Sequence, residues 1–164
     1  MFETIYSWFH SFYNDTMWNT VREIISEEDE LLFADSLFIV GIITIIVSFM
    51  IAFAYYVWPL NHPRFNAWKS WLLMFVVAAV INFGVGIGCG YSRVQSVNDN
   101  EEACSLILEN EDDEESDLTE AIGFGDYLGF GLSNIFVGSI FFVICCVPLT
   151  TFYKGNARFS PFRL

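Results

Sequence analysis

Basic residues are scarce in this chain of 164 residues, which has 7 Lys and Arg against 20 Asp and Glu and a formal net charge of -13. Nucleic-acid binding requires Lys and Arg against the phosphates, so we expect no nucleic-acid partner. Charged residues of both signs are also few, at 16%, whereas hydrophobic residues reach 54%. Such a chain cannot bury all of its apolar side chains in one small globule. The composition therefore disfavours a soluble enzyme and predicts a membrane protein whose charges lie outside the bilayer.

Charge is absent from three long apolar segments, residues 36–57, 71–90 and 132–153. A helix needs about 20 such residues to cross a bilayer, and lipid leaves the backbone amides no partner outside their own helix. None of the segments has the polar face of a soluble helix. The sequence therefore predicts an all-α integral membrane protein with three transmembrane helices. The start of the chain lacks the basic region of a signal peptide, so we expect the first helix to remain as an anchor.

The charges outside these segments are divided by sign. All 20 acids lie in residues 1–35 and 91–131, whereas five of the seven bases lie in residues 58–70 and 154–164. Lys and Arg near the ends of spans mark the cytoplasmic side. We therefore expect a cell membrane protein (inner or plasma membrane) with a cytoplasmic loop at 58–70 and a basic cytoplasmic tail. The N-terminus and the acidic loop at 91–131 then face outward.

The outward segment at 1–35 has apolar residues at helical spacing in two stretches whose faces differ, from Phe2 to Tyr13 and from Met17 to Ile25. This pattern predicts two short amphipathic helices with a break at residues 14–16, where Asn14 or Asp15 caps the second. The polar face of the first helix has no Lys or Arg, which favours contact with a partner protein over contact with lipid. The aromatic residues expected at that contact are Trp8, Phe9 and Phe12.

An acidic run lies within the 91–131 loop, which we expect to be partly disordered because like charges repel. The run lacks the alternating oxygen ligands and the central glycine of a calcium-binding EF-hand loop, and no metal site is predicted. Three interpretations stay open, namely a solvated loop, loose attraction of cations, or contact with a basic protein. The residues of the run are Glu111, Asp112, Asp113, Glu114 and Glu115.

Cysteines occur in two settings. Cys145 and Cys146 lie inside the third apolar segment, where they are expected to pack as small apolar residues. Cys89 and Cys104 both fall on the predicted outward side and form a possible disulfide if that side is oxidising. Such a bond would tie the acidic loop to the second span.

The second span ends in a glycine-rich stretch that contains two GxxxG pairs. Glycines at this spacing let two helices approach closely, so they are predicted to pack helices together or to line a pore. Asn82 precedes them and is expected to form a hydrogen bond between helices. The glycines are Gly84, Gly86, Gly88 and Gly90.

The string IGFGDY at Ile122–Tyr127 resembles the selectivity filter of potassium channels, in which backbone carbonyl groups replace the water around the ion. The resemblance covers six residues and implies a pore at this position. The sequence departs from that pattern, because Glu120 and Ala121 stand where a threonine is expected and an acidic run replaces the pore helix. We therefore interpret residues 123–131 as a flexible glycine-rich entry to the third span. The residues retained as pore-lining or packing candidates are Gly123, Phe124 and Gly125.

No Asp, Glu, Lys, Arg or His lies inside the three spans, whereas proton relays and coupled transporters normally need such residues. No nucleophile with a matching base can be assembled, so neither an enzyme nor a cofactor is predicted. The sequence favours a non-catalytic membrane protein that forms a homo-oligomer or joins a membrane complex through its glycines. Its acidic and aromatic outward face would then bind a partner, such as a basic protein. The alternative is a homo-oligomeric channel or pore that conducts cations.

Overall fold

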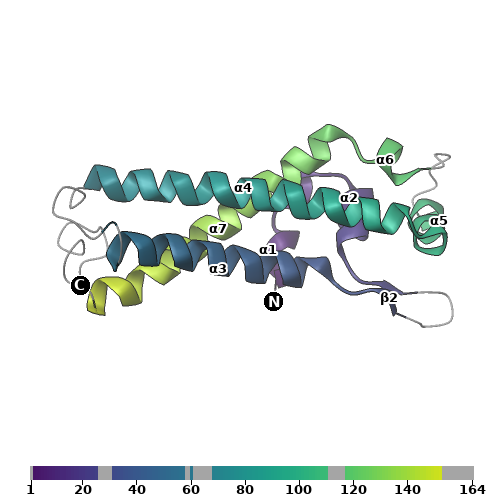
Figure 1. The fold of residues 1–164 in the computed structure, drawn as a ribbon. Coiled ribbons are helices and arrows are strands. Elements are labelled where there is room, and N and C mark those ends of the chain that lie inside the picture. Colours follow the sequence, from purple (N-terminus) through teal and green to yellow (C-terminus); the bar gives the residue numbers. More distant parts are fainter. Residues whose placement is uncertain (1, 26–30, 58–59, 61–67, 111–116, 153–164) are drawn as a thin grey trace.

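The computed structural model describes residues 2–25, 31–57, 60, 68–110 and 117–152. Three long helices dominate it (Figure 1), and each is long and apolar enough to cross a membrane. The first and third run in the same direction, and the second runs in the opposite direction. They are α3 (Ser36–Tyr56), α4 (Trp68–Asn98) and α7 (Phe124–Phe152).

The prediction of three apolar helices is confirmed, but two of them are longer than expected. Helix α3 matches the predicted segment to within one residue, since the Asp35 side chain caps it by accepting a hydrogen bond from the Leu37 amide at 2.9 Å. Helix α4 has 31 residues and is about 46 Å long at 1.5 Å per residue. It therefore extends well beyond a hydrocarbon core of about 30 Å. Helix α7 begins eight residues earlier than predicted.

The N-terminal region forms two short helices, α1 (Phe2–Ser7) and α2 (Asp15–Val21), with the 3-10 turn η1 (His10–Phe12) between them. The predicted cap is confirmed at Asn14, whose side-chain oxygen accepts a hydrogen bond from the Met17 amide at 2.8 Å. The second helix, however, stops four residues before its predicted end.

The expectation of an all-α fold is wrong in one detail. A small antiparallel hairpin follows α2, with strands β1 (Ile24–Ile25) and β2 (Leu31–Phe33). Its branched and aromatic side chains favour extended backbone, and the last two residues of the predicted helix form β1. Periodicity had assigned these isoleucines to a helical face.

Much of the predicted acidic loop is helical. Helix α4 continues through residues 91–98, and α5 (Glu101–Asn110) and α6 (Leu118–Ala121) follow it. The flexible entry predicted for residues 123–131 is also wrong, since α7 starts at Phe124. The acidic run from Glu111 to Glu115 lies outside the described residues.

The elements α2, β1, β2, α5 and α6, together with residues 91–98 of α4, gather at one end of the molecule (Figure 1) and are called the head here. One cluster of buried side chains joins the head to the long helices and includes Tyr6, Met17, Val94 and Phe130. A second cluster lies towards the other end of the long helices and includes Tyr56 and Phe142. The three long helices thus share a core that continues into the head.

Candidate functional site

The four glycines of α4 divide between two faces of the helix. A Cβ atom at Gly86 would lie 2.9 Å from the Asn134 Cβ and 3.0 Å from the Gly131 Cα, so Gly86 is in close contact with α7. A Cβ at Gly90 would lie 2.8 Å from the Met17 Cε in the head. One GxxxG pair is therefore used for packing within the chain.

The other GxxxG pair faces outward from the chain. A Cβ atom added at Gly84 or at Gly88 would meet nothing within 4 Å. The two positions are two residues away from Gly86 and Gly90, which corresponds to about 200° around the helix. The neighbouring Val80 is also exposed on this side. Gly84 and Gly88 therefore form a flat strip on a helix face that no other described residue of this chain covers.

Three further glycines on α7, which sequence reasoning did not single out, make contacts that are as close or closer. A Cβ at Gly138 would lie 2.4 Å from the Asn82 Nδ2, and one at Gly131 would lie 2.8 Å from the Phe83 ring. At Gly129 it would lie 1.8 Å from the Phe12 carbonyl oxygen. Gly131 and Gly138 are seven residues apart, which places both on one helical face. This spacing was the signal that could have identified these two glycines from the sequence.

A polar cluster lies at the centre of the three long helices. Asn134 accepts hydrogen bonds at its Oδ1 from the Tyr6 hydroxyl and, at 3.0 Å, from the Thr44 hydroxyl, and its Nδ2 donates to the Asn82 carbonyl oxygen at 2.6 Å. The Asn82 Nδ2 donates to the Ser48 hydroxyl at 3.2 Å. Asn82 thus makes hydrogen bonds between helices, and all five side chains are buried.

The N-terminal segment packs against the long helices of its own chain. The Phe2 ring lies directly over Gly41 of α3, and the Tyr6 ring stacks on Phe130 with the centroids 5.8 Å apart. Of the aromatic residues predicted to contact a partner, Phe9 stacks on Phe136 of α7 at 5.2 Å. Most of this aromatic face therefore has an intramolecular role.

The other two aromatic residues of the predicted partner contact, Trp8 and Phe12, differ in exposure. Trp8 is 68% exposed, and Phe12 is 43% exposed although its backbone touches α7. The Phe12 ring also lies 6.0 Å from the Phe136 ring of α7, so Trp8 is the most exposed of the three aromatic residues.

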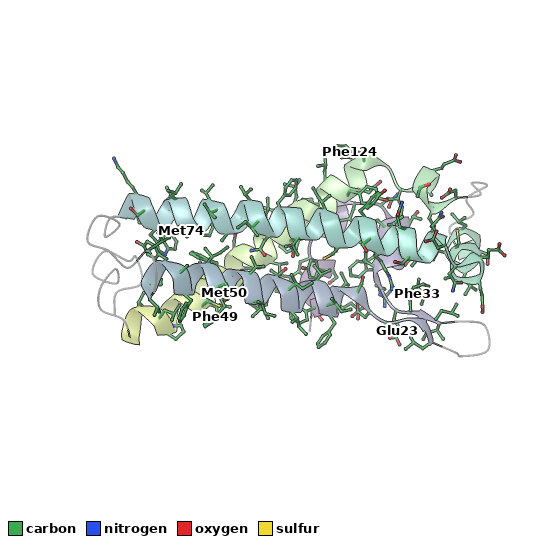
Figure 2. The ribbon with its side chains drawn as sticks, in the orientation of Figure 1. Glu23, Phe33, Phe49, Met50, Met74 and Phe124 are labelled. Atoms are coloured by element: carbon green, nitrogen blue, oxygen red, sulfur yellow. The ribbon has the colours of Figure 1, made fainter. Side chains whose placement is uncertain are left out.

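The stretch that resembles a potassium filter is instead the start of a helix. The Asp126 carboxylate accepts hydrogen bonds from the Gly123 amide at 3.0 Å and from the Asn14 amide at 2.9 Å. Phe124 and Gly125 are already part of α7, whose carbonyl groups point along the helix axis rather than into a pore. The local backbone is therefore unlike an ion filter. Phe124 is 73% exposed and projects from the head end of α7 (Figure 2).

The predicted disulfide disagrees with the structure, in which all four cysteines are free. Cys104 lies beside Asn98, with 3.7 Å between its Sγ and the Asn98 Oδ1. Cys89 precedes Asn98 by nine residues on the same straight helix, which corresponds to about 13 Å. A disulfide requires Cα atoms within about 7 Å, so the continuous helix keeps the two thiols apart.

The two bases of the head are engaged inside it. Arg93 donates hydrogen bonds from Nε to the Thr20 carbonyl oxygen at 2.9 Å and from Nη2 to the Arg22 carbonyl oxygen at 2.8 Å. Its guanidinium lies 4.7 Å from the centre of the Phe33 ring, which Figure 2 shows between the hairpin and α4. Arg22 pairs with Glu3 at 2.7 Å. Arg93 therefore fastens parts of the head together, and Arg22 joins the head to α1.

Carboxylates dominate the exposed surface of the head. Glu23, Asp99, Glu101, Glu102 and Glu120 are all exposed. Within the part of the chain that the structure describes, no three His, Cys, Asp or Glu residues come close enough to hold a metal ion. The surface is thus a dispersed field of negative charge, which attracts cationic groups without a defined metal geometry.

Comparison with known protein families, with curated proteins and with solved structures gives no match for this chain. The interpretation of function therefore depends on the open glycine strip, the buried polar cluster and the acidic head.

Proposed function

We propose that this chain is a non-catalytic integral membrane protein that forms homo-oligomers through α4 and binds a partner through its acidic head. The apolar surface supports insertion into a membrane. Large apolar side chains such as Phe49, Met50, Leu73 and Val80 are exposed along the long helices. Soluble monomers rarely expose apolar patches larger than a few hundred Å².

The proposed orientation places the head outside the cell membrane and the residues at the opposite end of the bundle in the cytoplasm. It is supported by the charge distribution along the sequence, because every acid falls in residues 1–35 and 91–131, the segments that contain the head, and most bases fall in residues 58–70 and 154–164. In this orientation the negative surface of the head faces the exterior, where a basic protein would meet it.

The open glycine strip is the observation on which the proposed oligomer depends. A glycine in a helix interior costs about 1 kcal/mol relative to alanine, and a packing partner commonly compensates for this cost. Gly86 and Gly90 have such partners within the chain, whereas Gly84 and Gly88 have none. A second copy in the same orientation would place its own strip there, so that two α4 helices cross at these glycines.

The polar cluster argues for anchoring rather than conduction by a single chain. The Asn82 Nδ2 donates to Ser48 of α3, and the Asn134 side chain bonds both Thr44 of α3 and the Asn82 carbonyl oxygen of α4. Gly138 packs so closely on Asn82 that an added Cβ would lie 2.4 Å from its Nδ2, so these polar groups are used for helix packing. A cation pore would have to lie between copies.

The test is self-association of the full chain in liposomes, measured by energy transfer between donor-labelled and acceptor-labelled copies. The paired change Gly84→Ile and Gly88→Ile should weaken association about tenfold or more, equivalent to 1.4 kcal/mol. Gly125→Ile is the matched control, because a Cβ at Gly125 also meets nothing within 4 Å. Unchanged energy transfer in the paired variant would show that α4 is not the interface.

A further inference from the structure

A groove opens in the head between strand β1 and helix α5. It encloses about 380 Å³. One bank is formed by residues 22–25, which lead into and include β1, and the other by Leu106 and Ile107 of α5. Asn19 of α2 completes the lining. The groove therefore lies between an extended segment and a helix that are far apart in the sequence.

The strand bank is an edge of the hairpin. β1 pairs with β2 through Ile24 opposite Phe33 and Ile25 opposite Leu31, and β2 is its one strand neighbour among the described residues. Both residues of β1 line the groove. The backbone of an edge strand is a template for another extended segment, and peptides are commonly bound in this way.

Negatively charged side chains lie near both sides of the groove, and its centre is apolar. Ile24 and Ile107 are buried, whereas Glu23 is exposed beside the hairpin (Figure 2). Glu102 lies four residues before Leu106 and therefore on the same face of α5, one turn from the groove. The groove thus has one carboxylate in its lining, Glu23, and a second, Glu102, one helical turn beyond its helix side.

The one cation of the groove is already compensated. The Arg22 guanidinium pairs with Glu3 at 2.7 Å and lies 5.6 Å from the centre of the Trp18 ring. Its charge is therefore directed towards the N-terminal segment. The uncompensated charge at the groove comes from Glu23 and Glu102.

We propose that this groove binds an extended segment of a basic partner protein, which adds as a strand alongside β1. Side chains of a strand alternate between its two faces. Apolar residues of the segment would pack on Ile24 and Ile107, and the alternate Lys or Arg residues would reach Glu23 and Glu102. This inference depends on the proposed binding of a basic partner. It adds that the bound segment of the partner is extended and alternates apolar residues with Lys or Arg.

The test uses a fluorescent peptide of about seven residues that alternates lysine and valine. Its binding to the full chain in nanodiscs is measured by fluorescence anisotropy. Ile25→Arg places a cation in the groove and should weaken binding about tenfold or more through repulsion and obstruction. Tyr91→Arg is the matched control, since Tyr91 is 52% exposed against 49% for Ile25 but lies on α4 and does not line the groove. It should change binding less than about twofold.

A second peptide, with the same charge and a proline at its centre, tests strand addition without altering the protein. It should bind at least about tenfold more weakly, because proline cannot donate a backbone hydrogen bond. The proposal that the groove binds an added strand would be overturned by any of three results. These are equal binding of both peptides, equal effects of the two arginine variants, and no measurable binding. Energy transfer between copies should persist in Ile25→Arg, so a failure here is distinguishable from a failure of the proposed oligomer.

Discussion

Asn134→Ala removes the side chain at which three hydrogen bonds of the core meet. Hydrogen bonds between helices in membranes contribute about 0.6 kcal/mol on average and at most about 1.7 kcal/mol. Three of them predict a loss of about 2 kcal/mol in the free energy of unfolding. The Tyr6 hydroxyl is then buried without its acceptor, which raises the expected loss to about 3 kcal/mol. The Thr44 hydroxyl can instead bond a carbonyl of its own helix, so it adds little.

The coupling between Tyr6 and Asn134 separates this hydrogen bond from a general packing effect. Tyr6→Phe alone should cost about 1 kcal/mol, because the ring keeps its stacking on Phe130. In the Asn134→Ala background the same change should instead recover about 1 kcal/mol, because it removes the hydroxyl that has lost its acceptor, so the coupling energy is about 2 kcal/mol. Ser133→Ala is the control, since its hydroxyl donates to the Phe130 carbonyl oxygen and not to the polar cluster. Its effect should add to that of Tyr6→Phe.

The assay is reversible unfolding of the full chain in mixed micelles of a mild detergent and dodecyl sulfate, followed by helical circular dichroism. A loss below about 0.5 kcal/mol for Asn134→Ala would refute the assigned role of the cluster. Additive effects of Tyr6→Phe and Asn134→Ala would refute the contact between the N-terminal segment and α7. That contact joins residues 128 positions apart, so it reports directly on the tertiary arrangement.

Three further results are expected. Gly129→Ala should release the N-terminal segment and expose it to limited proteolysis, because the new Cβ would lie 1.8 Å from the Phe12 carbonyl oxygen. Gly125→Ala is the control, since its Cβ meets nothing within 4 Å, and it should leave digestion unchanged. A mild oxidant should not join Cys89 to Cys104 in the folded chain, so a shift on non-reducing gels from that pair would contradict the continuous α4 helix. Burial raises the pKa of the Tyr13 phenol above its ordinary value of 10.0. As the pH rises above 10.0, the unfolded chain therefore loses this proton before the folded chain does, and the free energy of unfolding falls. Tyr13→Phe should reduce this loss of stability, as measured by unfolding at alkaline pH.

The candidate site was only partly predictable from the sequence. The GxxxG spacing identified α4 as a packing helix, but it could not assign one pair to the interior and the other to an open face. That division depends on where α7 crosses α4, and a crossing point is set by side chains on both helices. The same limitation explains why Gly129 and Gly138 were missed, since their close neighbours are distant in the sequence.

The groove in the head was beyond sequence reasoning for a related reason. Ile24 and Ile25 fit a helical period as well as they fit a strand, and only pairing with β2 decides between the two. Local patterns that need no distant partner were more reliable, as the Asn14 cap shows. A cap depends on four consecutive residues and their own backbone amides.

The sequence by itself determined that the chain has three long apolar helices and that its acids and most of its bases fall in different segments between and beside them. It could do so because a run of about 20 uncharged apolar residues has a helix as its stable form in lipid, whatever surrounds it. Only the tertiary structure decided that the N-terminal segment packs on Gly41 and Asn134, that Cys89 and Cys104 stay apart, and that Gly84 and Gly88 are left open. These features depend on how helices far apart in the chain cross, which the periodicity of any one segment does not contain.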